Sequence, residues 1–125
     1  MTKAANLTVK QLEQEIVKSI QDLFGNLLGH QPQQVSCQLV DKTLTVLLED
    51  SITQPEQILV ESGKNDLVKQ VRSNILVAIE SPLRANIEEI VGIPVIDLFA
   101  DSTLDTRRTS VVAILAAAPN LVEPN

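Results

Sequence analysis

Hydrophobic residues that recur every three or four positions predict a long helix near the start of the chain. Thr8 and Gln11 have the spacing of a capping box, in which two side chains satisfy free amides at a helix start. Gly29 suits the left-handed residue that ends many helices, so we predict the first helix over about 8–28. Its apolar face consists of Val9, Leu12, Ile16, Ile20, Leu23 and Leu27.

A second apolar stripe predicts a longer helix that starts near Asn65 and stops at Gly92. Such a helix would be about 39 Å long, and Pro82 lies inside it, so we expect a kink or break near 79–82. Thr53 and Glu56 form another capping box, which predicts a short helix over about 54–62 before it. The stripe of the long helix consists of Leu67, Val71, Ile75, Ile79, Leu83, Ile87 and Ile90.

Alternation of apolar and polar residues predicts two β-hairpins. The first joins strands at 35–39 and 44–48 through a turn at Asp41, and the second joins 95–99 to 109–117 through a polar linker. The element order α-β-β-α-α-β-β favours an α+β fold, a two-layer sandwich with a four-stranded antiparallel sheet and helices on one face. We predict one domain over 8–117, with disordered ends at 1–7 and 118–125.

Composition excludes several functional classes. A net charge of −6 with two aromatic residues argues against nucleic-acid binding. No run approaches the roughly 20 apolar residues of a membrane span, so we expect no membrane insertion, and no signal peptide is apparent. A single cysteine fits a reducing cytoplasm.

Candidate catalytic and metal-binding residues are few. His30 and Cys37 are the one imidazole and the one thiol; we expect a surface loop residue and an unreactive core residue, respectively. Asp97, Asp101 and Asp105 offer oxygen ligands for a hard cation, but their spacing is not that of an EF-hand and favours solvated turn residues. We predict no catalytic site, no bound metal and no cofactor.

Arg72 is the strongest single candidate for function. It lies beside the apolar stripe of the long helix, with Lys69 before it and Arg84 further on. Its planar guanidinium could bind an anion or the carboxylate of a partner. The alternative is a salt bridge with Glu80 or Glu61. As a surface residue, Arg72 is expected to contribute little to folding stability.

Two features predict a homodimer. The run 111–118 is apolar on both strand faces. The second long helix is also longer than one small domain can cover. Exposed apolar surface of that size is typical of an interface.

The chain resembles the MpsC-like family, formerly a domain of unknown function. The resemblance rests on a G-x-x-P-x-x-V entry to the first strand, the T-x-x-E start of the short helix, and V-x-x-V-R before I-E-x-I-x-G. The matching stretches are LTVKQLEQEIVKSI, GHQPQQVSCQLVDKTLTVLLEDSITQPEQILV and NDLVKQVRSNILVAIESPLRANIEEIVGIPVIDLFAD. Ser81 stands where that family often has Arg, and GHQP replaces G-x-G-P.

The resemblance implies a non-enzymatic accessory protein. The family is named for a bacterial system of membrane-potential generation and bicarbonate or cation uptake, whose other components are membrane proteins. We therefore expect a cytoplasmic regulatory homodimer with a membrane transport partner. The alternative is a small-anion sensing domain that uses Arg72.

Overall fold

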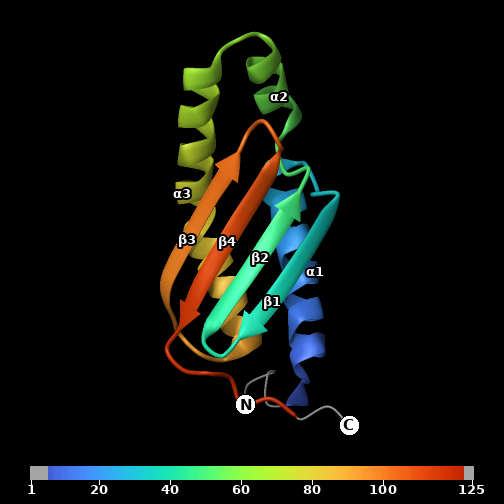
Figure 1. The fold of residues 1–125 in the computed structure, drawn as a ribbon, viewed down its shortest axis with the longest axis vertical. Helices are drawn as coiled ribbons and strands as arrows, with labels where there is room; N and C mark the ends of the chain where they lie inside the picture. The colour runs from blue at the N-terminus through green and yellow to red at the C-terminus, as the bar shows by residue number, and fades with distance from the viewer. Residues whose placement is uncertain (1–5, 123–125) are drawn as a thin grey trace.

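Two long helices cover one face of a four-stranded antiparallel sheet, and a short helix lies beyond one end of the sheet (Figure 1). Among the described residues, the other face carries no helix. This computed structural model describes residues 6–122 and confirms the predicted α+β class and element order. The elements are α1 (Val9–Leu28), β1 (Gln34–Val40), β2 (Thr43–Glu49), α2 (Gln54–Glu61), α3 (Asn65–Val91), β3 (Val95–Thr103) and β4 (Arg108–Leu115).

The two hairpins join through β2 and β4 to give the strand order β1-β2-β4-β3. The last strand is therefore central, as its doubly apolar sequence suggests. In the registers, Val46 lies opposite both Cys37 and Val111, so the alternating apolar residues of neighbouring strands share one face. β1 and β3 are the edge strands.

α1 forms as its sequence predicts, with both halves of the Thr8–Gln11 capping box and a left-handed Gly29 at φ 69°. The helix buries Leu12, Ile16, Ile20 and Phe24, while Leu27 remains 52% exposed. Together with the inner sides of the sheet and of α3, these residues form the hydrophobic core between the two layers.

α3 is continuous over 27 residues, including Pro82, so no break occurs at 79–82. Proline has no amide hydrogen, so the helix lacks the hydrogen bond to the carbonyl four residues earlier, but the hydrogen bonds of the flanking turns keep it continuous. In Figure 1 the first half of α3 extends past the sheet beside α2. Lys64, not Asn65, precedes the helix, and its side chain makes no capping bond.

The buried face of α3 differs from the predicted one in its first half. Val68, Arg72 and Leu76 are buried, whereas Leu67 is 47% exposed. Val71 and Ile75 are only partly buried. The prediction that Arg72 lies beside the buried stripe as a surface residue is therefore wrong. From Ile79 onward the predicted stripe is correct.

The β3–β4 hairpin is longer and tighter than predicted. β3 continues to Thr103, and Ser102 pairs with Thr109 in the register. The chain reverses at Leu104–Arg107, where Arg107 adopts a left-handed φ of 60°. Polar residues that suggested a loop instead form the end of the sheet nearest α2, because cross-strand pairing satisfies their backbone groups.

The two ends of the described chain meet. The Val122 amide donates to the Leu7 carbonyl at 2.8 Å, and Leu7 and Leu121 both pack against the core. Residues 1–5 and 123–125 lie outside the described range, so the predicted disorder of 1–7 and 118–125 stays a prediction. Within residues 6–122, no helix combines the length and apolarity that a bilayer crossing requires.

Candidate functional site

A buried ion pair joins α2 to α3. Arg72 Nε donates to Glu56 Oε2 at 2.7 Å, and Arg72 Nη2 donates to Glu56 Oε1 at 2.7 Å. The side chains are 4% and 2% exposed, respectively. Two parallel bonds between a guanidinium and a carboxylate are the strongest and most directional form of a salt bridge. The partner of Arg72 is thus Glu56, not Glu61 or Glu80.

Glu56 has a second role in the capping box of α2. Its Oε1 also accepts from the Thr53 amide at 3.1 Å and from the Thr53 hydroxyl at 2.7 Å. The capping box therefore helps to hold the carboxylate in the position where Arg72 binds it. Because every bond to this carboxylate comes from a fixed group, the desolvation cost of the buried charge is offset.

The same network continues into the sheet. Arg72 Nη2 donates to the Ser51 carbonyl at 2.8 Å, and the Ser51 hydroxyl lies 2.6 Å from the Thr109 hydroxyl. Thr109 is 2.7 Å from Ser102 Oγ on β3. These hydroxyls lock the β3–β4 hairpin to the segment that precedes α2, so the ion pair and the end of the sheet form one polar unit.

One donor of this network is unsatisfied. Arg72 Nη1 is buried and has no hydrogen-bond partner among the described residues. A buried polar group without a partner costs about 1–3 kcal/mol, and more when it is charged. Native proteins contain few such groups, so this nitrogen marks a position where an additional acceptor would be stabilising.

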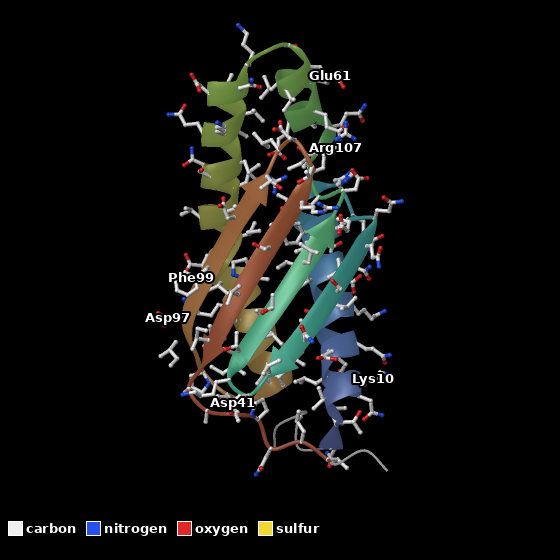
Figure 2. The ribbon with its side chains drawn as sticks, in the orientation of Figure 1. Lys10, Asp41, Glu61, Asp97, Phe99 and Arg107 are labelled. Atoms are coloured by element: carbon white, nitrogen blue, oxygen red, sulfur yellow. The ribbon has the colours of Figure 1, made fainter. Side chains whose placement is uncertain are left out.

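Arg72 lies in the wall of a cleft of about 570 Å³ between α3 and the β3–β4 hairpin. Lys69 and Ser73 line the cleft on the helix side, and Asp101 and Asp105 line it on the hairpin side. In Figure 2, Arg107 marks the hairpin tip, with Glu61 of α2 above it. The further wall residues are Val60, Asn65, Leu76, Ser102, Thr103 and Leu104.

The structure brings Arg72 and Lys69 together and separates Arg84 from them. Arg84 donates to the Val95 carbonyl at 2.6 Å and to Glu80 at 3.1 Å, which fixes the entry to β3. Glu88 accepts from the Val95 amide at the same place. Arg84 therefore has a local structural role at the other half of α3.

The three aspartates of the predicted loop do not form one cluster. Asp101 and Asp105 line the cleft, but Asp97 does not. Across residues 6–122, no group of three or more His, Cys, Asp or Glu side chains is arranged to hold a metal ion.

The single imidazole, on His30, and the single thiol, on Cys37, both lie in environments set by the fold. His30 Nε2 lies 2.8 Å from the Asp50 carbonyl, which ties the loop after α1 to the end of β2. Burial, and secondarily the Glu13 carboxylate, raises the pKa of the Cys37 thiol from 9.0 to about 12. A thiol with so high a pKa is a poor nucleophile at neutral pH, because the thiolate is the reactive form.

Sequence reasoning proposed Arg72, Arg84 and Lys69 as candidates, and it did not point to Glu56, Ser51 and Thr109, which belong to the polar network around Arg72. The available signal was an arginine at helical spacing between two apolar residues, Val68 and Leu76. An arginine inside such a stripe requires a buried counter-charge. Glu56 was assigned to helix capping, and the sequence does not indicate that the same carboxylate also faces α3.

Comparison with known proteins identifies a family for this chain. The family model described as "Na+-translocating membrane potential-generating system (MpsC)" matches residues 8–117, which include every helix and strand. No curated protein and no solved structure matches the chain. Since the family model covers most of the sequence, the resemblance inferred from the motifs is confirmed, and the chain belongs to the MpsC family.

Proposed function

We propose that this protein is a non-enzymatic accessory component of a membrane ion-transport system. It acts through protein–protein contacts, as a homodimer, in the cytoplasm. Membership of the MpsC family supports a role in a membrane-potential system. The engaged His30 and the high thiol pKa of Cys37 support a binding role over catalysis.

The observation that carries the contact proposal is the uncovered face of the sheet. Phe99 is 59% exposed on this face, and the register places it opposite Val112 on the central strand. Ile114 follows two residues later on β4, and Leu47 on β2 is 37% exposed. Among the described residues, α1 and α3 cover the opposite face and α2 lies beyond the end of the sheet (Figure 1).

Polar residues surround these apolar side chains. Asp97 lies opposite Ile114 and Asp101 opposite Ser110 on this face. Near the hairpin end, Arg108 donates to Glu49 at 2.8 Å in an exposed ion pair. An apolar centre with a charged rim is the usual anatomy of a protein interface.

The size of the face sets the expected affinity. Four strands of about seven residues span roughly 19 by 23 Å, or about 440 Å² of projected area. Burial from both copies gives roughly 900 Å², near the lower limit for a specific interface. We therefore expect a weak, concentration-dependent dimer in which two sheets pack face to face.

Sedimentation equilibrium over a range of concentrations tests the dimer. Phe99→Glu replaces the most exposed apolar side chain named on this face by a charge and is expected to give a monomer. Ile58→Glu is the matched control, because Ile58 is 56% exposed but lies on α2. A wild-type monomer at high micromolar concentration, or equal effects of both variants, refutes this contact.

The transport partner has its own test. Tagged protein is incubated with detergent-solubilised membranes of its host, and bound proteins are identified by mass spectrometry. We expect enrichment of an integral membrane ion transporter over a tag-only control, and dependence of radiolabelled bicarbonate uptake on this protein. Absence of any transporter from the bound fraction contradicts the accessory role.

A second candidate function is recognition of a small charged ligand. The unsatisfied Nη1 of Arg72, in the wall of a cleft that also contains Lys69, favours it. In this function the protein senses a metabolite, and occupancy of the cleft by the ligand changes the contacts of the protein with its partners.

A further inference from the structure

We infer that the cleft beside Arg72 binds a small zwitterion of the amino-acid class with an apolar side chain. The inference rests on the second candidate function and refines the ligand from a simple anion to a molecule with both charges. It is independent of the dimer and of the transport partner.

The first observation is the unsatisfied guanidinium nitrogen. Nε and Nη2 of Arg72 are saturated by Glu56 and Ser51, so Nη1 is the donor that remains for a ligand. Arg72 is held by three bonds shorter than 3 Å and cannot turn away. A carboxylate oxygen is the acceptor that best matches a fixed guanidinium N–H.

The second observation is the mixed charge of the cleft. Glu56 already neutralises Arg72, and the side chain of Asp101 lies on the uncovered face of the sheet, so Lys69 and Asp105 are the remaining charged groups of the cleft. An isolated anion would gain Lys69 but meet the Asp105 carboxylate. A molecule whose carboxylate faces Arg72 and Lys69, and whose ammonium faces Asp105, is complementary to these charges.

The third observation is the apolar part of the wall. Val60 of α2, Leu76 of α3 and Leu104 of the hairpin turn line the same cleft. The volume of about 570 Å³ lies within the range of small-molecule sites. An aliphatic side chain on the ligand would cover these three residues, so leucine-like amino acids fit better than glycine.

A series of side-chain and backbone contacts connects the cleft to the buried polar network. Ser102 lines the cleft and contacts Thr109, which contacts Ser51, whose carbonyl accepts from Arg72. Because Nη1 is buried, a ligand reaches it through a small displacement of the cleft wall. The hairpin residues around Asp105 are exposed and form part of that wall.

Three matched probes test the ligand class by isothermal titration calorimetry on the full chain. L-Leucine carries both charges, 4-methylpentanoate lacks the ammonium, and 3-methylbutylamine lacks the carboxylate. Inorganic phosphate is the simple-anion probe. We expect L-leucine to bind at least tenfold more tightly than any of the other three. Equal or tighter binding of phosphate or of either fragment overturns the inference, as does a failure of L-leucine to bind.

Variants test the site. Lys69→Ala and Asp105→Asn change exposed residues of the cleft and are each expected to weaken leucine binding about tenfold with an unchanged melting temperature. Lys64→Ala and Asp97→Asn are the matched controls, because these residues are exposed but do not line the cleft. Equal effects of cleft and control variants place binding elsewhere and refute the site. Sedimentation of the same variants reports the dimer separately, so failure of one proposal is distinguishable from failure of the other.

Discussion

Replacement of Arg72 by methionine should destabilise the fold strongly, although arginine is usually a surface residue. Arg72→Met removes two bonds to Glu56 and one to the Ser51 carbonyl, at 2.7, 2.7 and 2.8 Å. The Glu56 side chain is 2% exposed, so the substitution leaves a buried carboxylate without its cation. Removal of one member of a buried ion pair costs about 3–5 kcal/mol, because the remaining charge stays desolvated.

That loss is a large part of the whole stability, since a domain of this size is stable by about 5–15 kcal/mol. Equilibrium urea denaturation followed by circular dichroism measures it. The double variant Arg72→Met/Glu56→Leu removes both charges and should recover most of the loss, because well-packed apolar residues often replace a buried pair at no cost. A residual deficit of about 1 kcal/mol is expected from the lost capping of α2.

Comparison of the single variants with the double variant isolates the free energy of the ion pair. We expect a coupling free energy above about 2 kcal/mol from the double-mutant cycle. Arg108→Met is the matched control, because its ion pair with Glu49 is substantially exposed and contributes less than about 1 kcal/mol. A loss below about 1 kcal/mol for Arg72→Met, or additive single and double variants, would refute the assignment of Arg72 as a stabilising residue of the buried network.

Four further predictions concern the rest of the fold. Phe24 is 1% exposed, so Phe24→Ala should lower the free energy of unfolding by about 3–5 kcal/mol in urea denaturation, and a loss below 1 kcal/mol contradicts the assigned core. The raised pKa of Cys37 predicts thiol labelling at pH 8 about a thousandfold slower than in denatured protein, and equal rates would disprove it. Above pH 9.0 the unfolded thiol ionises while the folded one stays protonated, so unfolding free energy should fall by about 1.4 kcal/mol per pH unit towards pH 12, a component absent in Cys37→Ala. Pro82→Ala restores a helical hydrogen bond inside α3 and should raise the melting temperature; a lower one would show that the proline is needed for packing.

Local sequence patterns were sufficient to predict most of the architecture. The Thr8–Gln11 capping box and Gly29 set the ends of α1, and the stripe around Leu12 and Ile16 defined its buried side. Alternation placed β1 and β2 within a residue or two of their observed ends. These features depend on neighbours three or four residues away, or on strict alternation, which a single sequence displays directly.

The second half of the chain depended more on tertiary contacts. The polar residues Asp101 to Thr103 resemble a loop, yet they form the end of β3 because β4 supplies their partners. The first half of α3 buries Val68 and Leu76 and not the stripe that begins at Leu67. Hydrophobic periodicity treats arginine as a solvent-facing residue, so it favoured the wrong side of this helix.

The amino-acid sequence by itself determined the fold class, the element order and the family of this protein, because each is encoded in short-range spacing and in motifs. It also suggested Arg72, Arg84 and Lys69 as candidates for binding a partner or an anion, which stays a prediction. Only the tertiary structure decided that Arg72 is buried, that Glu56 neutralises it and that Lys69 and Asp105 line the same cleft. Those facts depend on the distance between residues far apart in the chain, and Coulomb and desolvation energies depend on that distance and on burial.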